Sequence, residues 1–131
     1  MSAHWSDDYI GIPYSNADCG ELAARVQRDV FGRDVTLPID RPCNLSGRSR
    51  MIDQLLLDYG RPTDSPRDGD AVLLSAGSLW HIGVYCLMTV GIGSDQPWLL
   101  HTTRHSVYST RIPLRRAADT NMIISGYYQW R

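Results

Sequence analysis

The hydrophobic period of this chain changes once, near residue 70, and this change decides the fold class. Before it, in the segments 19–31 and 49–59, apolar residues recur every three or four positions, the period of an amphipathic helix. After it, apolar and polar residues alternate over short segments, the period of a half-buried strand. Helices followed by a run of strands predict an α+β fold, with N-terminal helices packed on a largely antiparallel sheet.

Two helices and about five strands are expected from this pattern. The first helix spans about 19–31, and the second starts near Ser49 and stops at Gly60. A turn-rich connector, 63–69, leads into the strands. The expected strands are 71–75, 81–90, 98–102, 106–112 and 123–130.

Length and charge limit the possible functions. With 131 residues the chain is expected to form one domain, 1–131, with its own core. The formal net charge is −1 and the arginines are scattered, which argues against nucleic acid or an anionic membrane as partner. No apolar segment approaches the length of a membrane span, and the first residues do not resemble a signal peptide. Synthesis in the cytoplasm is therefore expected.

The three cysteines, Cys19, Cys43 and Cys86, form no C-x-x-C pair. An odd number at this spacing fits neither a disulfide framework nor a zinc site. One reactive thiol in a reducing compartment explains the count more simply. Cys43 follows a proline within an expected loop, so we interpret it as incidental.

Cys19 is the best candidate for a reactive thiol because of its place at a helix start. Asp18 is a favourable N-cap residue, and Glu21 lies three positions later, as in an acidic capping box. Cys19 then falls in the first turn, where unpaired N–H groups and the helix dipole stabilise a thiolate. The alternative is that Cys19 is a small buried apolar residue, as free cysteines often are.

A cysteine nucleophile needs a base, and the base needs a group that orients it. His81 opens the second expected strand and His101 closes the third, with a glycine-rich connection around their midpoint, residue 91. Residues equally distant from the turn of a hairpin face each other, so these histidines are expected to be cross-strand neighbours. His105 is the other candidate for the orienting group. Purely structural histidines, or a zinc site with Cys19, are the alternatives.

A series of short motifs runs along nearly the whole chain. They are G-I-P-Y (11–14), D-C-G (18–20), D-G-D-A-V-L (68–73), H-I-G-V-Y (81–85) and L-H-T (100–102). In this order they resemble the motifs of the NlpC-type bacterial cell-wall peptidases, which are compact relatives of papain.

This resemblance implies a papain-like fold and a cysteine peptidase acting on peptidoglycan stem peptides. The cleaved amide would be of the γ-D-glutamyl-diaminopimelate type. By the resemblance Cys19 is the nucleophile, His81 the general base and His101 the residue that orients it. Tyr14 and Asp18 are the implied oxyanion or substrate-binding residues. No metal or organic cofactor is implied.

The chain also departs from the family pattern. The loop between Tyr14 and Cys19 is shorter than in many members, and Glu21 replaces a small apolar residue. A stand-alone copy without an export signal resembles the members encoded in phage tail gene clusters. Under that reading phage tail proteins are the expected partners, and the phage particle or the cell wall is the destination. The alternatives are a structural module of a phage tail or other assembly, and an amidase or acyltransferase on another acyl substrate.

Overall fold

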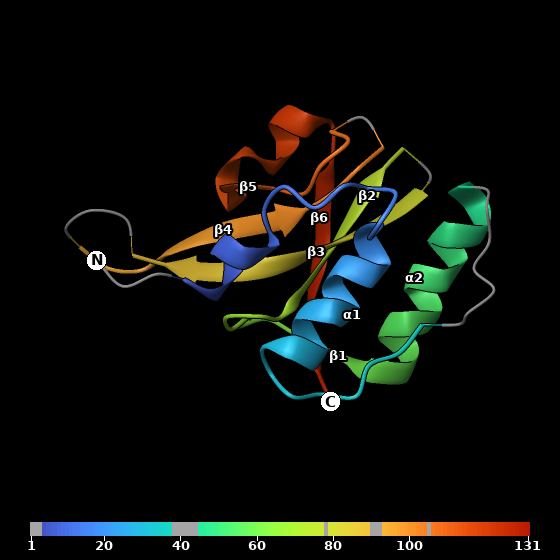
Figure 1. The fold of residues 1–131 in the computed structure, drawn as a ribbon, viewed down its shortest axis with the longest axis horizontal. Helices are drawn as coiled ribbons and strands as arrows, with labels where there is room; N and C mark the ends of the chain where they lie inside the picture. Colours follow the sequence, from blue (N-terminus) through green and yellow to red (C-terminus); the bar gives the residue numbers. More distant parts are fainter. Residues whose placement is uncertain (1–3, 38–44, 78, 90–92, 105) are drawn as a thin grey trace.

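A six-stranded antiparallel sheet separates two layers of helix (Figure 1). The computed structural model describes residues 4–37, 45–77, 79–89, 93–104 and 106–131, with the backbone alone at 45, 46 and 48. Helices α1 and α2 pack on one face of the sheet, and the short 3₁₀ helix η2 packs on the other. The α+β class predicted from the change of period is confirmed.

Along the chain, η1, α1 and α2 come first, and the strands follow, interrupted once by η2. The helices are η1 (Trp5–Tyr9), α1 (Cys19–Asp29), α2 (Leu45–Tyr59) and η2 (Leu114–Thr120). The strands are β1 (Gly60–Thr63), β2 (Ala71–Ala76), β3 (Leu79–Met88), β4 (Gln96–His101), β5 (Thr110–Pro113) and β6 (Ile123–Trp130). Their order across the sheet is β1-β6-β2-β3-β4-β5.

The sheet has six strands, one more than the sequence predicted. Strand β1 occupies a segment that was expected to end a helix and begin a turn, and it pairs with the end of β6. Gly60 lets the chain pass directly from α2 into this strand, because a Cβ there would lie 2.8 Å from the Leu56 carbonyl oxygen. Pro62 is tolerated because β1 is an edge strand of the sheet.

Two other expected boundaries are wrong by four residues, and β3 and β4 each begin two residues earlier than expected. Helix α2 starts four residues before Ser49, at Leu45. Strand β5 starts at Thr110 and not at 106. The reason for the later start is Val107, whose φ of 68° is left-handed and does not fit a strand.

Each face of the sheet covers its own apolar core. Ile82 and Val84 of β3 face the core under α1 and α2. Leu99 of β4 belongs to the core on the η2 side, together with Met122. His81 alternates with Ile82 along β3, so it faces the η2 side, as the strand pattern predicted.

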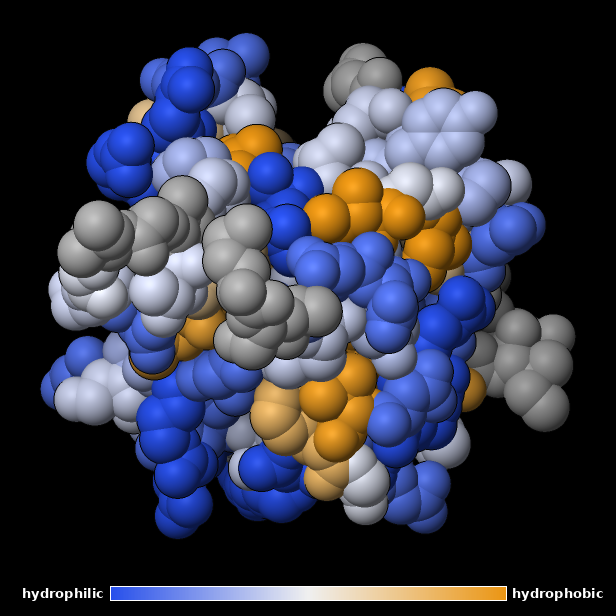
Figure 2. Space-filling model, turned by 60° about the vertical axis from the view of Figure 1, so that its left-hand side comes forward, coloured by the Kyte–Doolittle hydropathy of each residue, from blue (hydrophilic) through white to orange (hydrophobic). Residues whose placement is uncertain are grey.

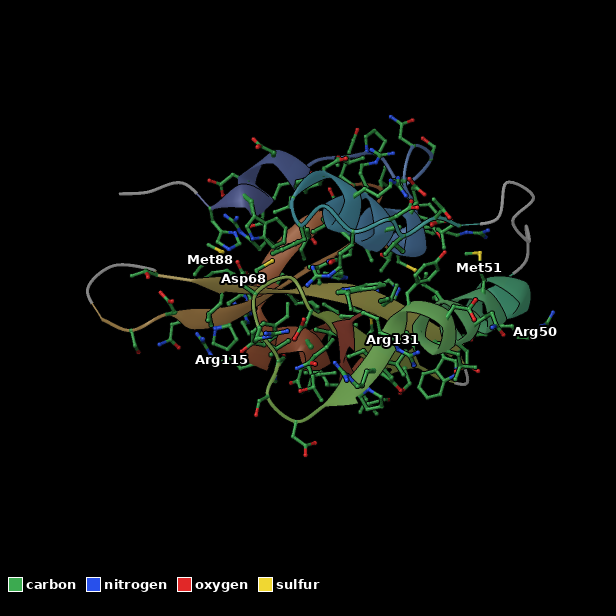
Figure 3. The ribbon with its side chains drawn as sticks, turned by 90° about the horizontal axis from the view of Figure 1, so that it is seen from below. Arg50, Met51, Asp68, Met88, Arg115 and Arg131 are labelled. Atoms are coloured by element: carbon green, nitrogen blue, oxygen red, sulfur yellow. The ribbon has the colours of Figure 1, made fainter. Side chains whose placement is uncertain are left out.

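The D-G-D motif, 68–70, anchors the start of β2. Gly69 has a φ of +93°, and a Cβ there would lie 2.4 Å from the ring of Phe31. Its carbonyl oxygen accepts hydrogen bonds from the Gln27 amide and the Trp130 indole. Asp68 accepts one from the backbone N–H of Leu87, and in Figure 3 it lies near Met88, the residue that follows Leu87. In this chain the motif therefore holds α1 against the sheet.

The outer surface carries only small apolar patches on the face drawn in Figure 2, where they are separated by hydrophilic side chains. Within the described helices, none is both long and apolar enough to cross a membrane.

Candidate active site

Cys19 is the first residue of α1, as predicted. The Asp18 carboxylate accepts a hydrogen bond from the Glu21 backbone N–H at 3.0 Å and so caps the helix. The Glu21 carboxylate in turn binds the Arg28 guanidinium at 2.8 Å. The Cys19 side chain is half-buried and packs against the core under α1. The thiol thus lies at the positive end of the α1 dipole.

His81 and His101 lie together on the η2 side of the sheet. Their ring centroids are 5.8 Å apart and the ring planes meet at 87°, an edge-to-face contact. The predicted direct pairing is wrong by two residues: Val84 pairs with Leu100, which puts His101 opposite Gly83. The β3–β4 hairpin is centred on residue 92, one position later than the midpoint of the two histidines. A hydrogen bond from the Thr89 hydroxyl to the Asp95 carboxylate across the connection is consistent with this register. The histidines are diagonal neighbours.

Gly83, the residue opposite His101, must be a glycine because the space beside its Cα is already filled. A Cβ would lie 2.4 Å from the side chain of Leu99 and 3.1 Å from the Leu100 carbonyl oxygen. Leu99 therefore packs directly over the backbone of β3 at Gly83, next to its pairing partner Tyr85. The glycine of the H-I-G-V-Y motif is explained by this close approach.

Burial keeps both imidazoles neutral. Burial, with a smaller effect from His101, lowers the pKa of His81 to about 3. Burial also lowers the pKa of His101. Nε2 of His101 lies 3.5 Å from the Thr110 hydroxyl oxygen. In the described part of the chain, Nε2 of His81 and Nδ1 of His101 are buried without a hydrogen-bond partner.

A pocket of about 600 Å³ opens beside the two histidines, and Tyr14 forms part of its wall. The Tyr14 backbone N–H donates to the Val107 carbonyl oxygen at 2.7 Å, and Pro13 forms a β-bridge with Tyr108. The segment that leads into α1 therefore crosses the chain just before β5.

Three of the five predicted site residues line this pocket: Tyr14, His81 and His101. Asp18 is at the cap of α1. Cys19 follows Tyr14 by five residues and is not among the pocket-lining side chains of the described residues. The start of α1 points toward the end of the sheet where β3 begins and β4 finishes (Figure 1). His105, the other candidate for the orienting group, and Cys43 lie outside the described residues.

Two further pocket residues were not predicted from the sequence. Thr110 of β5 pairs with His101 of β4 and puts its hydroxyl beside the ring. Arg104 lines the pocket from the segment after β4. Both contacts depend on the β4–β5 register, and the sequence placed the start of β5 wrongly.

The zinc alternative finds no support in the grouping of side chains. Within the described ranges, no three His, Cys, Asp or Glu residues are grouped so that they could hold a metal ion.

Comparisons with models of known families, with curated proteins and with solved structures found no match. The function is therefore inferred from the site.

Proposed function

We propose that the protein is an NlpC-type cysteine peptidase with a papain-like fold. It hydrolyses an amide bond of the γ-D-glutamyl-diaminopimelate type in peptidoglycan stem peptides. Cys19 is the nucleophile, His81 the general base and His101 the residue that orients His81. One observation carries the proposal: Tyr14, on the segment that leads into Cys19, shares a single pocket with both histidines.

The reaction follows from these roles. The Cys19 sulfur attacks the amide carbonyl carbon while its proton passes to Nε2 of His81. The imidazolium gives this proton to the leaving amine, which departs and leaves a thioester on Cys19. His81 then deprotonates a water molecule that attacks the thioester carbonyl, and the acid product leaves as Cys19 regains its proton.

The start of α1 supplies the electrostatic part of the mechanism. The Cys19 backbone N–H belongs to the first turn of α1, and it is the candidate donor to the oxyanion. Losing one such donor costs about 3 kcal/mol of transition-state stabilisation in comparable enzymes. Asp18 fixes the turn that holds this N–H, and Tyr14 is the candidate for a further contact to the substrate.

The neutral state of His81 suits a base. A pKa of about 3 leaves the ring unprotonated near neutral pH, so its lone pair is free to accept the thiol proton. The same burial disfavours the imidazolium until a negative charge forms beside it. A thiolate or an oxyanion provides that charge, so proton transfer is coupled to attack on the substrate.

His101 acts on His81 through its ring. The edge-to-face contact restricts rotation of the His81 imidazole, and the Thr110 hydroxyl lies beside His101. A base that is held in one orientation loses less entropy when the reaction begins.

A binding or assembly module, such as a component of a phage tail, is the second candidate. One observation favours it: Cys19 does not line the pocket that the two histidines share, among the residues described. Phage tail proteins are then the partners, and the phage particle is the destination. An amidase or acyltransferase would use the same residues on a different acyl group.

Digestion of purified peptidoglycan, with mass spectrometry of the released fragments, tests the proposal. Wild-type protein should release fragments cut beside the γ-D-glutamyl residue, and Cys19→Ala should release none. Cys86→Ala is the matched control, because Cys86 is fully buried in the core under α1 and α2 and should be dispensable for cleavage. Equal release by Cys19→Ala would leave the binding module as the better account.

A further inference from the structure

The inner surface of the pocket is mostly apolar. Ala76 and Leu79 pair at the tip of the β2–β3 hairpin, and Ile112 comes from β5. Met122 closes the pocket from the segment between η2 and β6. Apolar lining of this kind favours a hydrocarbon group, since its burial is worth about 25 cal/mol per Å².

The charged side chains that line the pocket, among the described residues, are positive only. Arg104 lines it, and no aspartate or glutamate does so among the described residues. Both histidines are neutral because burial lowers the pKa of each ring. A carboxylate therefore meets a complementary charge at Arg104, whereas an ammonium group finds no carboxylate in the lining.

Polar atoms in the wall also lack partners. His101 is only 4% exposed, and its Nδ1 has no hydrogen-bond partner within the described residues. The same is true of Nε2 of His81. Two of the lining side chains therefore have hydrogen-bonding capacity that the described residues do not use.

We propose that the pocket binds an apolar group that carries a carboxylate. The hydrocarbon part lies against Leu79, Ile112 and Met122, and the carboxylate is directed to Arg104. This assignment goes beyond the proposed function and does not depend on it, because Cys19 is not among the lining residues in the described part of the chain. Two sources share this chemistry: a fatty acid, and the C-terminal apolar residue of a peptide.

Isothermal titration of the full chain with four small molecules tests the proposal. Octanoate represents the fatty acid and N-acetylphenylalanine the peptide end. Octylamine has the same chain as octanoate with the opposite charge, and acetate has the charge without the chain. One or both of the apolar acids should bind at least about tenfold more tightly than octylamine and acetate. The tighter acid identifies the source. Binding of neither acid, or equal binding of octylamine, overturns the proposal.

Paired variants locate the binding. Arg104→Gln should weaken binding of the acid about tenfold, while Arg115→Gln, on η2 and outside the pocket lining, should not change it. Ala76→Trp fills the pocket and should abolish binding, and the exposed Ala118→Trp on η2 is its control. Circular dichroism confirms that each variant is folded. Unchanged binding in both Arg104→Gln and Ala76→Trp contradicts the assigned site.

A Cys19→Ala variant separates this proposal from the catalytic one. The variant should bind the acid as wild type does, because Cys19 is outside the lining. If peptidoglycan cleavage depends on Cys19 but no acid binds, only the pocket assignment is wrong. If the acid binds but no Cys19-dependent cleavage occurs, only the peptidase assignment is wrong.

Discussion

The rings of His81 and His101 meet edge to face on the η2 side of the sheet, with their centroids 5.8 Å apart. Their strands bring them together diagonally, since Gly83 and not His81 is opposite His101. The proposed roles of base and orienting residue depend on this contact, and so do several of the predictions below.

Replacing the two histidines should have unequal effects. His81→Ala removes the proton acceptor and should lower kcat about 10³-fold. His101→Ala leaves the acceptor in place but frees its ring, and should lower kcat about 10²-fold with little change in KM. Steady-state kinetics on a stem peptide measure both. His4→Ala is the control, because His4 binds Asp68 and is not a lining residue of the pocket. If His101→Ala keeps wild-type activity, His101 does not orient His81.

The thiols should differ in reactivity. Cys86 is fully buried, and burial raises its pKa to about 12, so it should react slowly with iodoacetamide near neutral pH. Cys19 is half-buried at the helix start and should be alkylated first. Peptide mapping by mass spectrometry at several times gives both rates. Faster labelling of Cys86 than of Cys19 would contradict the choice of nucleophile.

The buried histidines should make stability depend on pH. His81 has a pKa of about 3 when folded, against 6.5 for the ordinary group, so the unfolded chain binds more protons between these values. Its contribution is therefore fully present above about pH 6.5 and is lost as the pH falls toward about 3, by up to about 1.4 kcal/mol per unit. His101 acts in the same direction.

Urea unfolding over this pH range measures the effect. The free energy of unfolding should fall less steeply with decreasing pH in His81→Gln than in wild type. Equal slopes in wild type and His81→Gln would show that His81 is not buried as a neutral ring.

Two strand glycines should respond differently to alanine. In Gly83→Ala the new Cβ would lie 2.4 Å from the Leu99 side chain, so we expect a loss of about 1–3 kcal/mol of stability. In Gly126→Ala on β6, the nearest atom is 4.0 Å away, so the change should be small. Urea unfolding compares the two. A neutral Gly83→Ala would contradict the close packing of Leu99 on β3.

Local chemistry determined the parts of the structure that the sequence predicted well. Asp18 and Glu21 marked the start of α1, and alternation marked β6 from Ile123 to Trp130. The same alternation correctly placed His81 on the face opposite Ile82.

The rest depended on tertiary contacts. Gly60 and Pro62 resemble a helix stop, and only pairing with β6 makes that segment a strand. The β3–β4 register depends on how the connection bonds across Thr89 and Asp95, which spacing does not reveal. The pocket joins segments from both ends of the chain, so its apolar lining and Arg104 could not be read from any one motif.

The most direct test of the central claim is to trap the thioester. The full chain is mixed with a stem peptide, quenched in acid during turnover and analysed by intact and peptide mass spectrometry. If Cys19 is the nucleophile, an added mass equal to the acyl part of the substrate should be found on Cys19 and be missing in Cys19→Ala. Turnover with no adduct on Cys19, or with an adduct on another residue, would contradict it.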